Sequence, residues 1–206
     1  MNALAFLDYA SVFVFALTGA LVASRAQLDI VGFVFIACLT AVGGGTVRDV
    51  ILDRPVFWVD SPSFIVVASI AAFIVFFTAH LLESRHRAIP WIDAFALAVA
   101  VPAGVAAAVA VGAVWPVIVI MGVATGCFGG LMRDVVCNEV PLVLKQGELY
   151  VTCAFAGAGA AGVLLHLGQP LPIALAGCAF VTLALRIGSI AFGWRLPVYK
   201  SRPPRA

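Results

Sequence analysis

Seven long apolar runs, separated by short polar segments, dominate the pattern along the chain. They cover residues of about 5–24, 30–52, 64–82, 91–110, 116–137, 149–167 and 172–192. A helix needs about 20 mostly apolar residues to cross a bilayer, and each run comes close to that length. These runs do not alternate polar and apolar residues as the strands of a membrane β-barrel do. The pattern therefore predicts an all-α membrane protein with seven transmembrane helices.

Composition supports this interpretation and excludes a soluble protein. Of the 206 residues, 64% are apolar and only 11% are charged, whereas soluble domains are about half apolar and a quarter charged. So few charges cannot cover a surface that faces water. We expect a single membrane domain over residues 1–206, with the lipid bilayer as its surroundings and no nucleic-acid partner.

The charged loop residues predict an orientation. No basic residue precedes the first apolar run, and Asp8 lies near its start, so we interpret this run as a permanent span and not as a signal peptide. Arg54 is almost alone on one side of the predicted membrane. The other side receives most of the basic loop residues and the basic tail 193–206: Arg25, Arg85, Arg87, Lys145, Arg195, Lys200, Arg202 and Arg205. The positive-inside rule then places the N-terminus outside and the C-terminus in the cytoplasm.

Residues that usually carry enzyme chemistry are scattered. The five cysteines all lie in apolar runs without metal-ligand spacing, and we interpret them as small packing residues. The three histidines (His80, His86 and His166) are scattered near span ends or in a loop, with no nucleophile–base or metal-ligand pattern. We therefore predict neither an enzyme nor a bound cofactor.

One polar stretch inside an apolar run, Thr-Ala-Val-Gly-Gly-Gly-Thr-Val-Arg-Asp at 40–49, occurs twice. Adding 85 to the numbering maps Thr40, Gly44, Gly45, Arg48 and Asp49 onto Thr125, Gly129, Gly130, Arg133 and Asp134, and also maps Asp8 onto Asp93. The chain therefore divides into repeat 1 (about 5–82), repeat 2 (about 91–167) and an added helix (about 172–192). Because each repeat has three spans, the second must enter the membrane from the opposite face, as in many transporters.

The glycines should disturb both helices that contain them. Each interior glycine costs a helix about 1 kcal/mol relative to alanine, so we expect kinked or broken helices at residues 43–45 and 126–130. A break would free backbone carbonyls, and those of Gly44 and Gly129 could then coordinate a permeant cation.

The duplicated charges predict a polar path. Ionisable residues inside a membrane face the bundle interior, a partner or water. Consecutive helical residues point about 100° apart, so we expect Arg48 to pair with Asp8 and not with Asp49, and Arg133 to pair with Asp93. Arg186, near the end of the last span, is expected to extend toward the lipid headgroups. A purely structural alternative stays open, in which the Arg-Asp pairs only hold helices together and the glycines only allow close helix crossing.

The duplicated segments resemble a known family. GGGTVRDVILDRPVFW, its second copy GGLMRDVVCNEVPLVL, and seven spans arranged three plus three plus one are similar to the trimeric intracellular cation (TRIC) channels, whose prokaryotic members also go under UPF0126 and a "glycine transporter" domain name. The resemblance implies a homotrimer in a prokaryotic inner membrane. Each protomer would have its own pore for K⁺ or Na⁺, lined by the first, second, fourth and fifth spans. The chain departs from the pattern at Phe128, which stands opposite Gly43, and at Met132-Arg133-Asp134, where animal members have Lys-Glu-Val.

Two functions follow, a monovalent cation channel or a secondary transporter for glycine or a similar small zwitterion. In the transporter, helix N–H ends and an arginine would bind the carboxylate. The candidate ion-pathway residues are Asp8, Thr18, Thr40, Gly43, Gly44, Gly45, Arg48, Asp49, Asp93, Thr125, Gly126, Gly129, Gly130, Arg133 and Asp134.

Overall fold

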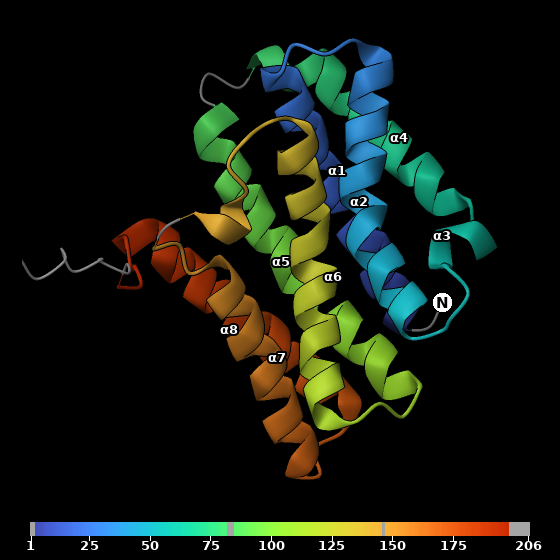
Figure 1. Cartoon of the computed structure of the whole chain (residues 1–206), viewed down its shortest axis with the longest axis vertical. Helices are drawn as coiled ribbons and strands as arrows, with labels where there is room; N and C mark the ends of the chain where they lie inside the picture. The colour runs from blue at the N-terminus through green and yellow to red at the C-terminus, as the bar shows by residue number, and fades with distance from the viewer. Residues whose placement is uncertain (1–2, 82–84, 146, 198–206) are drawn as a thin grey trace, which may run out of the picture.

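The computed structural model describes residues 3–81, 85–145 and 147–197, and these are helical throughout apart from their connections (Figure 1). The elements, in order, are α1 (Ala3–Arg25), α2 (Ile30–Ile51), α3 (Phe57–Asp60), α4 (Ser63–Thr78), η1 (Ala79–Leu81), α5 (Arg85–Ala110), α6 (Trp115–Val136), η2 (Leu142–Leu144), α7 (Tyr150–His166) and α8 (Leu171–Phe192). The described part of the chain contains no β-strand. The all-α prediction is confirmed.

Six of these helices are long and apolar enough to cross a membrane, namely α1, α2, α4 with η1, α5, α6 and α8. The remaining predicted span, the sixth at about 149–167, corresponds to α7, an apolar helix of only 17 residues. Helix α5 begins at Arg85, and its membrane-spanning part, Ile89–Ala110, agrees with the fourth predicted span. The short elements α3 and η2 were not predicted. The protein is a multi-pass membrane protein.

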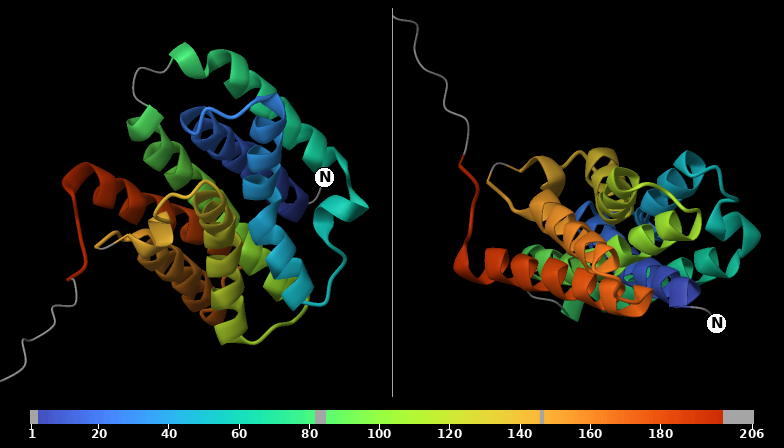
Figure 2. Two further views of the ribbon diagram at one scale, coloured as in Figure 1. Left: turned by 45° about the horizontal axis from the view of Figure 1, so that its top comes forward. Right: turned by 90° about the horizontal axis from the view of Figure 1, so that it is seen from below.

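Four helices, α1, α2, α5 and α6, form the centre of the molecule. Helix α4 packs on α1 and α2, while α7 and α8 pack on the side formed by α5 and α6 (Figures 1 and 2). Among the spans, α5 has the largest buried share, and most of its buried side chains are alanine or valine. Small residues let helices approach closely in a bilayer, where lipid provides no hydrophobic drive for association.

The two halves of the centre match under the 85-residue offset. Shifting α2 (Ile30–Ile51) by 85 gives 115–136, the bounds of α6. Each helix is followed by a residue with left-handed backbone, Asp53 (φ 50°) and Asn138 (φ 55°), and Asp and Asn are among the side chains that best tolerate this conformation. The carboxyl ends of α2 and α6 lie at opposite ends of the molecule (Figure 1). The three-plus-three inverted arrangement with an added helix, α8, is therefore observed.

Of the kinks or breaks expected at the glycines, the breaks are wrong. Helices α2 and α6 each run without interruption through their glycine clusters. A side-chain carbon added at Gly44 would overlap the carbonyl oxygen of Thr125, and one added at Gly129 would overlap that of Thr40. The glycines thus let the two backbones touch where they cross. Because the helices stay intact, the basis for freed cation-binding carbonyls at Gly44 and Gly129 is lost.

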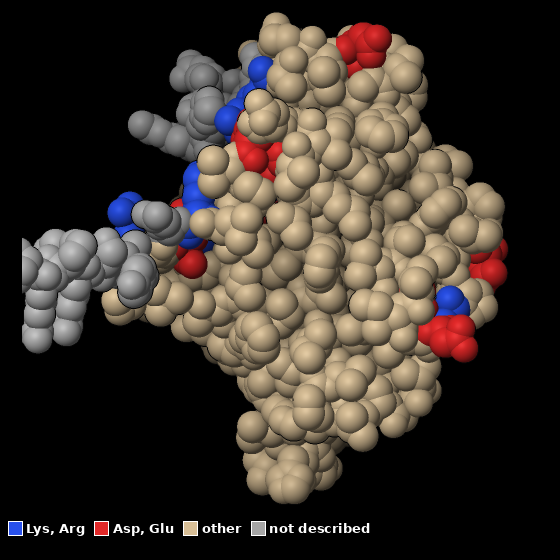
Figure 3. All heavy atoms as spheres, in the orientation of Figure 1, with Lys and Arg blue, Asp and Glu red and all other residues tan. Residues whose placement is uncertain are grey.

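The outer surface fits a bilayer. On the face shown in Figure 3, the charged atoms lie at the margins of the view and the broad middle is uncharged. Large apolar side chains from α4, including Ile70, Phe73 and Phe77, are each about half exposed or more. Exposed apolar surface of this extent marks a region that lipid or protein covers.

Candidate functional site

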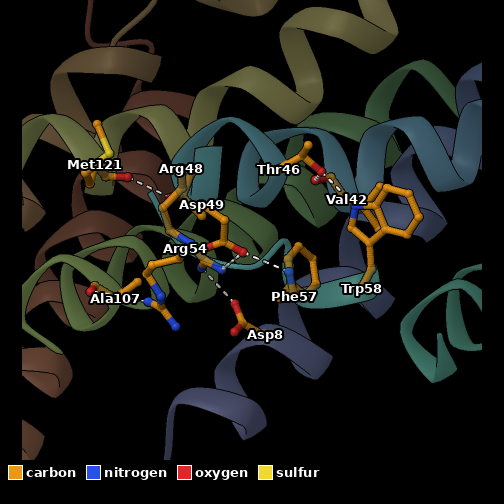
Figure 4. Close-up of polar contacts among 11 residues, drawn as sticks. Asp8, Val42, Thr46, Arg48, Asp49, Arg54, Phe57, Trp58, Ala107 and Met121 are labelled. Atoms are coloured by element: carbon orange, nitrogen blue, oxygen red, sulfur yellow. Dashed lines mark hydrogen bonds and ion pairs between the residues drawn. The ribbon is translucent and has the colours of Figure 1, made fainter. Parts of the chain in front are cut away.

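The first cluster consists of Asp8, Arg48 and Asp49, and it joins the start of α1 to the last turn of α2 (Figure 4). Arg48 donates from Nη1 to Asp8 Oδ1 at 2.9 Å and from Nε to Asp49 Oδ1 at 2.8 Å, with a further bond from Nη2 to Asp49 Oδ2 at 3.2 Å. Arg48 and Asp49 are fully buried and Asp8 is nearly so. One arginine therefore neutralises part of the charge of two carboxylates inside the protein.

The loop after α2 completes this cluster. Asp49 Oδ2 accepts a hydrogen bond from the backbone N–H of Phe57 at 3.0 Å, which satisfies a free donor at the start of α3. The ring of Phe57 lies 5.5 Å from the guanidinium carbon of Arg48, within the range of a cation–π contact. Next to it, Trp58 Nε1 donates to Thr46 Oγ1 at 2.8 Å. Asp49 thus both pairs with Arg48 and caps the start of α3.

The second cluster consists of Asp93, Arg133 and Asp134 and has the same design. Arg133 donates from Nη1 to Asp93 Oδ1 at 2.9 Å and from Nε to Asp134 Oδ1 at 2.7 Å. Asp134 Oδ2 accepts from the backbone N–H of Leu142 at 3.0 Å, and Leu142 is Phe57 shifted by 85. The corresponding distances in the two clusters differ by no more than 0.1 Å.

The predicted ion-pair partners of Arg48 and Arg133 were right across helices and wrong within a helix. Arg48 pairs with Asp8 and Arg133 with Asp93 across helices, as expected. The prediction that neighbouring Arg and Asp would not pair is wrong, because Arg48 binds Asp49 and Arg133 binds Asp134. The 100° rule fixes only the Cα–Cβ directions, and an arginine side chain is long enough to fold back over its neighbour.

The two clusters differ in their nearest polar neighbours. Arg133 Nη1 also donates to Thr18 Oγ1 at 3.0 Å, whereas the residue equivalent to Thr18 is Ala103, which has no hydroxyl. Beside the first cluster Arg54 donates to the carbonyl of Ala107 at 3.3 Å. Its equivalent, Glu139, carries the opposite charge and pairs with Arg25 at 3.0 Å.

The remaining predicted residues lie at the helix crossings between the clusters. The hydroxyls of Thr40 and Thr125 are buried and donate back to the carbonyls of Ile36 and Met121, at 2.6 and 2.7 Å. A side chain at the other predicted glycines would meet Met132 (at Gly43), Phe57 (at Gly45), Leu97 and Val101 (at Gly126), or Arg133 and Tyr150 (at Gly130). The structure therefore brings the predicted residues together along one core of α1, α2, α5 and α6.

A small cavity of about 90 Å³ adjoins the second cluster. Arg133 and Asp134 form its inner wall, and Arg25, Glu139 and Lys145 lie around it. It is large enough for a few water molecules and gives the second cluster a polar approach from the end of the molecule. Within the described residues, no three His, Cys, Asp or Glu side chains are grouped as metal ligands.

The sequence interpretation missed the contacts among three residues, Arg186, Glu148 and Tyr150. Arg186 does not extend to the surface, as expected, but is buried and donates to Glu148 at 2.8 Å, and its guanidinium lies 5.1 Å from the ring of Tyr150. These residues lie outside the matched motif, so the offset suggested no partner for them. A lone arginine inside a predicted span was the available signal, because such a charge needs a partner. Part of the predicted basic tail, residues 198–206, lies outside the described residues.

Comparison with known proteins identifies the family. The family model described as "Glycine transporter" matches residues 5–80 and 90–166. The chain is 37% identical over 199 residues to the UPF0126 inner membrane protein YadS of Escherichia coli K12, with 94% of each chain covered. It is 36% identical over 192 residues to a UPF0126 membrane protein of Vibrio cholerae, covering 90% of this chain and 78% of that one.

Solved structures give the same result. The TRIC channel orthologue from Rhodobacter sphaeroides matches with a TM-score of 0.90 and 39% identity, over 94% of this chain and all of that one. A second structure, described as showing the basis for conductance through TRIC cation channels, matches with a TM-score of 0.86 and 26% identity, over 98% of this chain and 100% of that one. These similar structures are channels and not enzymes. On sequence and fold together, the chain belongs to the TRIC/UPF0126 family of membrane proteins.

Proposed function

We propose that the protein is a monovalent cation channel that conducts K⁺ and Na⁺ along a path within each protomer, between α1, α2, α5 and α6. One observation carries the proposal: two matching ion-pair clusters lie at opposite ends of these four helices. Buried charges are expensive in a membrane and commonly mark ion pathways. The similar solved structures of TRIC cation channels support the same function.

The charge balance of the clusters favours cations. Each cluster combines two aspartates with one arginine, which leaves a formal charge of −1 in its centre. Negative charge set in low-dielectric walls attracts cations and repels anions. The arginines hold the carboxylates in place, so the charge stays at a fixed position.

The narrow part of the path lies between the clusters. There Gly44 and Gly129 place the backbones of α2 and α6 in direct contact. Ions would pass this level when the two helices separate. We further propose a homotrimer in the inner membrane, with the N-terminus outside and the C-terminus in the cytoplasm.

Recording from purified protein in planar bilayers tests the channel. Unitary currents in asymmetric KCl should reverse close to the K⁺ equilibrium potential. Glu139→Gln removes a negative charge at the cavity beside the second cluster, so it should lower the K⁺ conductance at low salt and have little effect at about 1 M salt, where charges are screened. Asp60→Asn, on the exposed side of α3, is the matched control and should leave the conductance unchanged. Folded protein that gives no K⁺ current would overturn the proposal.

The family model named for glycine transport favours a second candidate, a transporter for glycine or a similar zwitterion. Against it, both arginines that could bind a carboxylate are already bonded to two aspartates each. Saturable uptake of labelled glycine into vesicles that contain the protein, without unitary currents, would select the transporter.

A further inference from the structure

Tyr150, the first residue of α7, lies against the second cluster. It is 1% exposed, and its hydroxyl points to the carbonyl of Gly126 at 3.5 Å. A side-chain carbon at Gly130 would lie 3.6 Å from this hydroxyl and 3.6 Å from Arg133 Nη2. The phenol and the guanidinium of Arg133 thus lie on either side of the same position, next to Gly130 of α6.

A third buried arginine holds Tyr150 from the other side. Arg186 of α8 lies over the tyrosine ring, with 5.1 Å between the guanidinium carbon and the ring centroid. Arg186 is 1% exposed and its Nη1 bonds Glu148, while its Nε has no hydrogen-bond partner among the described residues. Because a buried charge without its partner is strongly destabilising, Arg186 depends on this one carboxylate. The Glu148 side chain is 36% exposed and so remains open to the solution.

In the first cluster, a different aromatic residue lies beside the arginine. There the space beside Gly45 is filled by the ring of Phe57, which also lies next to Arg48. Phe57 is the first residue of α3, and its backbone N–H bonds Asp49 of the same cluster. Under the 85-residue offset Phe57 corresponds to Leu142 and Tyr150 to Ile65, so the two aromatic residues are not copies of one another. Of these two aromatic residues, only Tyr150 contacts a residue of α8, the helix outside the repeat.

We propose that Tyr150 is a positioning residue for Arg133, and that the Arg186–Glu148 pair transmits movement of α8 and of the start of α7 to the second cluster. The inference rests on the proposed channel function. According to this proposal, α8 controls only the half of the ion path that contains the second cluster. When Glu148 and Arg186 are paired, Tyr150 keeps its contact with the α6 backbone at Gly126. The second cluster then keeps the ion pairs of Arg133 with Asp93 and Asp134.

Tyr150→Phe tests the proposal with the smallest change, because it removes the hydroxyl and keeps the ring. The loss of one hydrogen bond corresponds to about a fivefold change in an equilibrium, so the open probability should change by about that factor while the unitary conductance stays the same. Glu148→Gln should act in the same direction, and Glu148→Asp should partly restore wild-type gating. Tyr9→Phe is the matched control, since the Tyr9 hydroxyl bonds Ser63 at 2.6 Å near the first cluster; its gating should not change.

A second measurement does not depend on conduction. Cys137 ends α6 one turn after Arg133 and is half-buried, so its maleimide labelling rate, located by mass spectrometry, reports the position of this helix end. The rate should rise in Tyr150→Phe and Glu148→Gln and stay constant in Tyr9→Phe. If folded Tyr150→Phe shows wild-type gating and wild-type labelling, the proposal is wrong. If wild-type protein gives no current but labelling follows the expected order, the channel function fails and the coupling through Tyr150 stands.

Discussion

The first and second clusters share one ion-pair design but differ in what surrounds it. The first is local, because Arg48, Asp49 and Phe57 lie within ten residues of one another and only Asp8 comes from elsewhere. The second also receives Thr18 from α1 and Tyr150 from α7, with Arg186 of α8 behind the tyrosine. Duplication explains the shared geometry, while residues outside the matched motif make the two ends of the path unequal.

Removing either arginine should have the largest effect and should expose this inequality. Arg48→Met and Arg133→Met each leave two buried carboxylates without their partner, which costs about 3–5 kcal/mol of stability. The loss should be greater for Arg133→Met, because Asp93 is fully buried whereas Asp8 retains 8% exposure. Unfolding of both variants in one detergent measures the difference. Equal losses would contradict the proposed inequality.

The helix crossing should instead respond symmetrically. Gly44→Ala and Gly129→Ala each force a methyl group into the opposite backbone, and such overpacking costs about 1–3 kcal/mol. We expect similar losses of thermal stability in the two variants. Gly159→Ala is the control, since a side-chain carbon there meets nothing within 4 Å, and it should be neutral or slightly stabilising. A large difference between the two crossing variants would show that the centre is not symmetric.

Thr18→Val should affect only the second cluster. It removes the hydroxyl that accepts from Arg133 and keeps the shape of the side chain, so it should cost about 1 kcal/mol. Thr78→Val serves as control, because the exposed Thr78 hydroxyl bonds only its own helix, at the carbonyl of Ile74. Melting temperatures of both variants, measured beside Arg133→Met and the double variant with Thr18→Val, test the link. Additive losses would argue against a Thr18–Arg133 bond.

The smallest effect is expected at the rim of the second cluster. Arg25→Gln breaks the pair with Glu139, whose side chains are 22% and 32% exposed. Exposed pairs contribute less than about 1 kcal/mol and are screened by salt. The stability difference from wild type should therefore be small at low salt and disappear at high salt. A loss that persists in high salt would place this pair in the buried core of the cluster.

The sequence predicted well the features that the two repeats share. The offset located both clusters and the cross-helix pairs of Arg48 and Arg133, because identical spacing in two copies restricts which helices can meet. It also contained a signal for the loops, since Phe57 and Leu142 match in position and donate the same backbone bond.

Two kinds of error have physical causes. The expected helix breaks followed from the helix propensity of glycine, about 1 kcal/mol per residue, whereas the structure shows the close helix crossing of the alternative interpretation. Arg186, Glu148 and Tyr150 come from separate parts of the chain and have no copies, so their assembly depends on how α8 packs, which spacing does not encode.

Helix α7 has a consequence for the surrounding lipid. Its 17 residues rise about 26 Å at 1.5 Å per residue, a few ångströms less than the roughly 30 Å hydrocarbon core of a bilayer. Phe155 and Val163 are about half exposed on this helix, so lipid or a neighbouring protomer meets a span that is too short. Where lipid covers α7, we expect local thinning of the bilayer or snorkelling of flanking side chains to accommodate the short span, and Tyr150 lies at one end of it. We therefore expect the thickness of the membrane to matter at the end of the molecule that holds the second cluster.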